Sequence, residues 1–73
     1  MVTDRISVGS SFVVEASFRN IKKGETVSVN RIIKYRWSVE EFYSCIVYMP
    51  MSINPPRYEN VYQKDLINLK LKL

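Results

Sequence analysis

The chain has 73 residues, a net charge of +4, 47% hydrophobic residues, one cysteine and no histidine. Its length fits a single domain, residues 1–73, with one small core. Cys45 is the only cysteine, so no internal disulfide can form. The absence of histidine removes the commonest zinc ligand and the usual partner of a catalytic nucleophile. We therefore expect no metal, no cofactor and no enzyme activity.

The first ten residues, MVTDRISVGS, lack the basic start and continuous apolar core of a signal peptide. No run reaches the roughly 18 apolar residues of a membrane span, so we expect a soluble cytoplasmic protein with no membrane partner. Residues 11–18, SFVVEASF, then alternate in hydrophobicity and place four apolar residues, from Phe12 to Phe18, on one face. This period of two predicts a half-buried strand.

A basic segment follows the predicted first strand. Residues 19–36 hold six basic side chains against Glu25 alone, a net charge of +5, whereas the rest of the chain sums to −1. The segment begins with RNIKKGE, in which Asn20 and Gly24 are turn residues, so we expect a basic loop there. Clustering of this kind favours an anionic partner on one side of the molecule.

The stretch VSVNRIIKYRW, residues 27–37, predicts a second strand with two different faces. With a period of two, one face holds Val27, Val29, Arg31, Ile33, Tyr35 and Trp37, and the other holds Ser28, Asn30, Ile32, Lys34 and Arg36. A platform for single-stranded nucleic acid needs rings and cations on the same accessible surface, and this register separates them. We therefore expect Tyr35 and Trp37 to close the core, so that replacing Trp37 would destabilise the fold.

Arg31 is the misfit on that apolar face, and two accounts of it stay open. A bulge near Arg31 would shift the register of the strand. Alternatively, the guanidinium could extend past the rim of a barrel.

Residues 37–49 also allow two interpretations. Ser38 followed by Glu41 is a capping-box pattern, which would begin a helix with an apolar face. Against this, YSCIVYM is rich in aromatic and β-branched residues, which pack well on a pleated surface. We favour a hairpin with a turn at Ser38–Glu41 and a strand at 42–49, in which Cys45 is buried and unreactive.

All three prolines fall in PMSINPPRY, residues 50–58, which predicts a long loop. The last residues, ENVYQKDLINLKLKL, carry a polar turn at 63–65 and then alternate apolar and polar side chains. They predict a short helical turn followed by a closing strand.

The whole layout resembles the small SH3-like barrels, including the Tudor and KOW-type modules and the small barrels of this kind encoded by bacteriophages as accessory proteins. The resemblance is carried by GETVSVNRI (24–32), FYSCIVYM (42–49) and VYQKDLINL (61–69). It implies an all-β SH3-like barrel of about five strands with a short helical turn near the C-terminal strand. The chain lacks the paired acidic residues and the Ala-Leu-Tyr-Asp-Tyr signature of peptide-binding SH3 domains, and it lacks the aromatic cage spacing of methyl-lysine readers, so neither ligand is implied.

The leading hypothesis is a non-enzymatic binding module that contacts an anionic partner, nucleic acid or an acidic protein surface, through its basic loop and hairpin face. Nucleic acid is preferred, and the contacts would go to phosphates rather than bases. The candidate anion-binding residues are Arg19, Lys22, Lys23, Lys34 and Arg36.

The alternative is a protein-interaction module, such as a viral accessory protein that binds a host protein or self-associates through a sheet edge. Its candidate contact residues are Tyr48, Met49, Met51, Arg57 and Tyr58. Grouped exposure of Tyr48, Met49 and Met51 would favour this protein partner.

Overall fold

The computed structural model describes residues 6–37 and 40–71. Its elements in chain order are β1 (Ser11–Val14), β2 (Thr26–Lys34), β3 (Glu41–Tyr48), β4 (Arg57–Tyr62), the 3-10 helix η1 (Gln63–Asn68) and β5 (Leu69–Leu71). All the strand pairs are antiparallel, and the sheet order is β4-β3-β2-β1-β5. The prediction of an all-β domain of about five strands, with a short helical turn before the last one, is confirmed.

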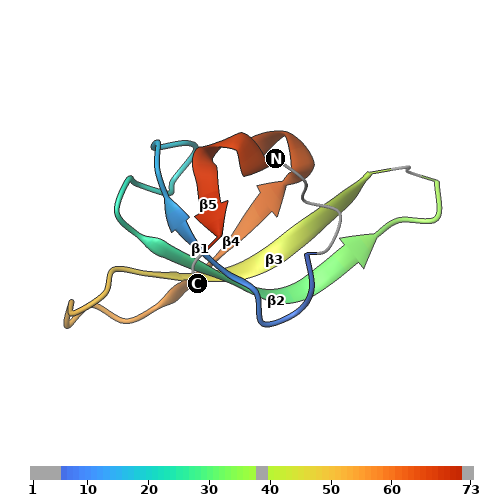
Figure 1. Ribbon diagram of the computed structural model, residues 1–73. Coiled ribbons are helices and arrows are strands. Elements are labelled where there is room, and N and C mark those ends of the chain that lie inside the picture. The colour runs from blue at the N-terminus through green and yellow to red at the C-terminus, as the bar shows by residue number, and fades with distance from the viewer. Residues whose placement is uncertain (1–5, 38–39, 72–73) are drawn as a thin grey trace.

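The sheet is curled but not closed. β4 and β5 form its two edges in the sheet order. Figure 1 shows β1 and β5 folded over the part of the sheet built by β2, β3 and β4, with η1 covering the same side. The β2-β3 hairpin extends to one end of the molecule, and the loop between β3 and β4 extends to the other (Figure 1). This open arrangement differs from the closed barrel that the sequence suggested.

The core fills the space inside this curl. Its members are Phe12, Val14, Ile21, Val27, Val29, Tyr43, Cys45, Val47, Val61, Leu66 and Leu69. β3 shows the reason most directly, because Tyr43, Cys45 and Val47 alternate with residues that are only half-buried. Burial raises the pKa of the Cys45 thiol to about 12, and the predicted burial of this residue is confirmed.

Residues 41–48 form a strand, so the favoured hairpin is confirmed and the helix suggested by the capping box is wrong. Ser38 and Val39, which belong to the predicted turn, lie outside the described residues. The first strand is shorter than predicted and ends at Val14. The amides of the next two residues donate instead to the carbonyl of Asn68, at 2.8 and 3.4 Å, which turns the chain out of the β1 ladder.

An ion pair ties the β1-β2 loop to β4. The Arg57 guanidinium donates to both carboxylate oxygens of Glu25, at 2.7 and 2.9 Å, and to the carbonyl oxygen of Asn20 at 2.6 Å. Glu25 is buried, and its hydrogen bonds from Arg57 hold the pKa of this carboxyl below its ordinary value of 4.5. Arg57, a candidate partner-binding residue, therefore also has a role inside the fold.

Candidate functional site

A β-bulge in β2 decides which side chains reach the outer face of the hairpin. Val29 pairs with Cys45, and Arg31 pairs with Ser44, the next residue of β3 in the antiparallel ladder. Asn30 is therefore the extra residue, and the register shifts between Val29 and Arg31. Of the two accounts of Arg31, the bulge is the one that the structure contains.

Beyond the bulge, the faces of β2 are exchanged relative to an unbroken strand. Ile32 lies opposite the buried Tyr43, so Ile32 continues the inner face and Arg31 takes the outer one. Tyr35 and Trp37, which continue the outer alternation, are 49% and 81% exposed. The prediction that these two rings close the core is wrong, because it assumed a register without the extra residue.

Three exposed rings and the half-buried ring of Phe42 form a continuous series that we call the aromatic ladder, made of Trp37, Tyr35, Phe42 and Tyr62. Trp37 and Tyr35 are stacked, with ring centroids 5.5 Å apart and an interplanar angle of 5°. Tyr35 contacts Phe42 at 5.7 Å, and Phe42 contacts Tyr62, its partner on β4, at 5.5 Å. Offset and tilted pairs at these distances are favourable, so the contacts stabilise this arrangement of the rings.

Arg19 completes the ladder at its β4 end. Its guanidinium carbon lies 4.6 Å from the centroid of the Tyr62 ring, a cation–π distance. Its Nε donates to Oδ2 of Asp65 at 2.9 Å, and the same oxygen accepts the backbone N–H of Tyr62 at 3.1 Å. The nearly buried carboxylate of Asp65 in η1 therefore positions both the Arg19 guanidinium and the backbone of Tyr62 at the end of β4.

The backbone at Arg19 supports this positioning. Its φ of 50° lies in the left-handed region, which is uncommon for a residue other than glycine. The bridge between Phe18 and Ile21, with hydrogen bonds of 2.9 Å in both directions, closes the tight turn that requires this conformation. Such conformations often occur at functional sites.

A pocket of about 540 Å³ opens beside the ladder. Its lining residues are Arg19, Tyr35, Glu40, Glu41, Phe42, Asn60, Tyr62, Gln63 and Lys64. Three of the four ladder rings line it, with basic side chains from the β1-β2 loop and η1 and carboxylates from the start of β3. The site can therefore hold a flat or apolar group against the rings while charged groups contact its rim.

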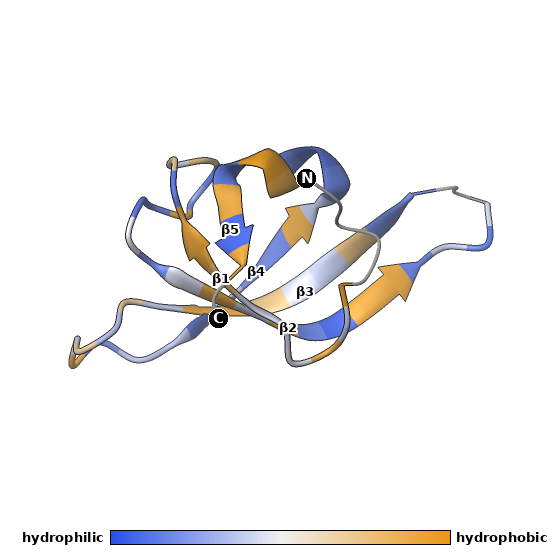
Figure 2. Ribbon diagram, viewed as in Figure 1, coloured by the Kyte–Doolittle hydropathy of each residue, from blue (hydrophilic) through white to orange (hydrophobic). Residues whose placement is uncertain are grey.

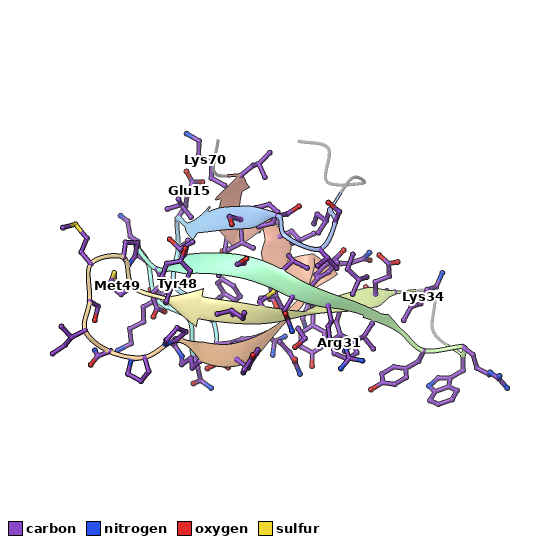
Figure 3. The ribbon with its side chains drawn as sticks, turned by 90° about the horizontal axis from the view of Figure 1, so that it is seen from below. Glu15, Arg31, Lys34, Tyr48, Met49 and Lys70 are labelled. Carbon is purple, nitrogen blue, oxygen red and sulfur yellow. The ribbon has the colours of Figure 1, made fainter. Side chains whose placement is uncertain are left out.

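The five predicted anion-binding residues fall into three places. Arg19 lines the pocket. Lys34 ends β2 near the tip of the hairpin, as Figure 3 shows, and Arg36 lies in the following turn. Lys22 and Lys23 precede Gly24, which lies beside the methyl group of Met49 at the other end of the molecule.

The predicted partner-binding residues gather around that other end. Met49 and Met51 are exposed in the β3-β4 loop, and Tyr58 is exposed near the start of β4. Tyr48 is half-buried, and Figure 3 shows it beside Met49, away from Lys34. Figure 2 shows hydrophobic residues at the tip of this loop.

The sequence-based assignment missed the ladder as a surface. Tyr35 and Trp37 were assigned to the core, and Phe42 and Tyr62 were not recognised as their neighbours. The available signal was Arg31, whose place among apolar residues pointed to the bulge that turns the rings outward.

Within residues 6–37 and 40–71, no group of three or more acidic, cysteine or histidine side chains is arranged to hold a metal ion. The same residues contain no helix with the length and hydrophobicity needed to span a membrane. Comparison with protein-family models, curated proteins and solved structures found no match for this chain.

Proposed function

We propose that this chain is a non-enzymatic module that binds single-stranded nucleic acid on the aromatic ladder. The observation that carries this proposal is the exposed stack of Trp37 on Tyr35, continued by Phe42 and Tyr62. Single-strand binding needs stacking rings and cations on one accessible surface. Arg31 shares a face with Tyr35 and Trp37, and the bulge before Arg31 turns that face outward, so the rings and this cation become accessible together.

In the proposed complex, successive bases stack on the rings while the sugar-phosphate backbone follows the cations. Arg31 lies on the outer face of β2, Arg36 lies between Tyr35 and Trp37 in the sequence, and Arg19 contacts the Tyr62 ring at the β4 end of the ladder. Because every base has an aromatic face, the binding tolerates different sequences. The phosphate contacts make the affinity strongly dependent on salt.

We also infer an SH3-like architecture for the domain. The supporting observations are the five antiparallel strands in the order β4-β3-β2-β1-β5 and the 3-10 helix between the last two strands. The ladder would then lie where the β1-β2 loop, the β2-β3 hairpin and the 3-10 helix meet. Loops carried on a rigid scaffold are common positions for binding residues.

The experiment is a salt titration of fluorescence anisotropy with labelled single-stranded and double-stranded oligonucleotides. Trp37→Ala should weaken single-strand binding about tenfold, the loss expected for one stacked base. Arg36→Ala should lower the slope of log affinity against log salt by about 0.7, the value for one phosphate contact on a single strand. Ile67→Ala, which changes an exposed apolar residue of η1 outside the ladder and the pocket lining, is the matched control.

The proposal is wrong if the wild-type chain fails to bind any oligonucleotide at about 50 mM salt, where phosphate contacts are strong. Equal losses in the Trp37 and Ile67 variants would also count against the ladder as the binding surface.

A second candidate, the protein-interaction module, is favoured by a separate observation. Met49, Met51 and Ile53 are exposed together in one loop. Exposed apolar groups of this kind are typical of protein contact sites. A chain that binds no oligonucleotide but loses a protein contact when this loop is changed would support this function instead.

A further inference from the structure

The loop between β3 and β4, residues 49–56, carries apolar side chains that are exposed to solvent. We call it the apolar loop. Its sequence is MPMSINPP, with no charged residue, and the side chains of Met51 and Ile53 are fully exposed. Nothing else in the described chain packs on these two residues.

The apolar loop has a defined conformation. The amide of Ser52 donates to the carbonyl of Met49 at 3.1 Å, which closes a four-residue turn with Pro50 in its second position. Met51, in the third position, has a φ of 64°, so the turn is of type II, in which this position favours glycine. The hydroxyl of Ser52 then accepts the amide of Asn54 at 3.0 Å, and two prolines follow.

Met51 is therefore unfavourable for the isolated fold in two ways. Its backbone adopts a conformation that an L side chain resists, and its side chain stays in water. Glycine would satisfy this turn better, and the exposed methionine side chain adds nothing to the core of its own fold. A fixed turn lowers the entropy lost when a contact forms with a shaped pocket. A fluid lipid surface would gain much less from that fixed geometry.

The same chain carries a pocket suited to this loop. The ladder pocket is concave and is lined by the rings of Tyr35, Phe42 and Tyr62. Its charged lining residues are Glu40, Glu41, Lys64 and Arg19, and Arg19 is neutralised by its ion pair with Asp65, so the two carboxylates face one remaining cation. The apolar loop is convex and lies beside a basic pair, Lys22 and Lys23. The two ends are thus complementary in shape and hydrophobicity, and the small acidic excess of the pocket suits the basic pair beside the loop. Within one molecule the loop and the β2-β3 hairpin extend in opposite directions (Figure 1), so a chain does not fill its own pocket.

We propose that the apolar loop of one copy docks in the ladder pocket of a second copy, so that the chain self-associates head to tail. The contact joins two different surfaces, and it therefore builds a ring or an open chain rather than a two-fold dimer. Met51 and Ile53 lie against the rings, and Lys22 and Lys23 approach the two carboxylates of the pocket. This proposal does not depend on nucleic-acid binding, although both ligands would occupy the ladder and would compete.

Sedimentation velocity of the purified chain over about 10 μM to 1 mM, a range that covers weak contacts, tests the association. The mean mass should rise with concentration for the wild-type chain. Met51→Gly removes the side chain but keeps the turn, and Tyr35→Ala removes part of the pocket. Both variants should stay monomeric, whereas Ile67→Ala, which changes an exposed residue of η1, should associate like the wild type. Circular dichroism of each variant confirms that it is folded.

Mixing the two monomeric variants gives the decisive result. The Met51→Gly chain retains a pocket, and the Tyr35→Ala chain retains a loop, so one productive contact remains between them. The mixture should form a heterodimer and no larger species. A monomeric wild-type chain at about 1 mM, or a mixture that stays monomeric, overturns the proposal.

Two further measurements distinguish lipid and nucleic acid from a second copy of the chain. Co-sedimentation with anionic phosphatidylserine-containing vesicles that Met51→Gly abolishes, together with a monomeric wild-type chain, would assign the loop to lipid and overturn self-association. An oligonucleotide titration on the same samples reports nucleic-acid binding separately. A chain that associates but binds no oligonucleotide would support this contact and reject the function proposed above.

Discussion

Val29 and Arg31 are separated by one residue in sequence, yet they pair with adjacent residues of β3, Cys45 and Ser44. This shift in pairing decides which side chains of β2 lie on the outer face of the sheet. It leaves Val29 in the core and sends Arg31 outward, so that Tyr35 and Trp37 follow Arg31 into solvent. A single extra residue thus converts two expected core aromatics into the start of an exposed ladder.

Trp37→Ala should change the free energy of unfolding by less than about 1 kcal/mol, because the ring is exposed and loses mainly its stack on Tyr35. Tyr43→Ala should cost about 3–5 kcal/mol, because that ring is buried in the core. Urea unfolding followed by circular dichroism compares the two. Similar losses in both variants would mean that Trp37 is packed inside the protein.

Deleting Asn30 should leave the same residues in the core. In the observed register Asn30 has no partner on β3, so its removal restores a regular ladder in which Arg31 stays outside and Ile32 inside. Trp37 is the only tryptophan, and its fluorescence reports the result directly. Emission should remain that of a solvent-exposed indole and should be quenched freely by acrylamide. A shift of the emission to shorter wavelength in the deletion variant would contradict the assigned register.

Cys45 should react with thiol reagents only when the protein unfolds. Its side chain is buried, and burial raises its pKa to about 12, so the reactive thiolate is scarce at pH 8. Labelling of the native chain by a disulfide reagent should be far slower than labelling in urea. Equal rates in the two conditions would show that the inner face of β3 is accessible.

Arg57→Ala should lower the free energy of unfolding at pH 7 by about 1–3 kcal/mol, since it leaves the buried Glu25 carboxylate without its main partner. The lower limit of this range allows for the partial exposure of the Arg57 side chain, which weakens the ion pair through solvent screening. Thermal melts of this variant and of Lys64→Ala, an exposed charge on η1, provide the comparison.

The same ion pair predicts a dependence on pH. The pKa of Glu25 is depressed in the folded state, so its contribution is fully present above about 4.5 and is lost as the pH falls through the lower folded value. Glu25→Gln should therefore flatten the fall in stability below pH 4.5, measured by urea unfolding at several pH values. If the variant loses stability below pH 4.5 as steeply as the wild type, other carboxyl groups cause that loss.

Asp65→Ala should destabilise the protein more than Arg19→Ala. The Asp65 carboxylate accepts the amide of Tyr62 at the start of η1 as well as Arg19 Nε, so its loss removes a cap and an ion pair. We expect a cost of about 1–2 kcal/mol for Asp65→Ala, the range for a lost cap. Arg19→Ala should cost less, because its side chain is partly exposed and the cap remains. Chemical denaturation of both variants tests this order.

The sequence by itself determined the class of the fold and most of its strand positions. Period-two alternation predicted the strands around Phe12 and Val27, because burying one face of a strand requires that pattern locally. The aromatic and β-branched residues around Cys45 predicted the next strand, and the polar turn before Leu66 predicted η1. The burial of Cys45 followed from the alternation within that strand, which places Cys45 and Val47 on one face.

The tertiary structure alone decided which face the later residues of β2 occupy and which distant groups meet. The bulge depends on how β2 pairs with β3, and a shift of one residue exchanges the two faces of every residue that follows. The contacts of Arg19 with Asp65, and of Arg57 with Glu25, join residues 46 and 32 positions apart, so no local pattern could reveal them. The ladder likewise combines rings from β3, β4 and the end of the β2-β3 hairpin, and only the folded sheet places them side by side.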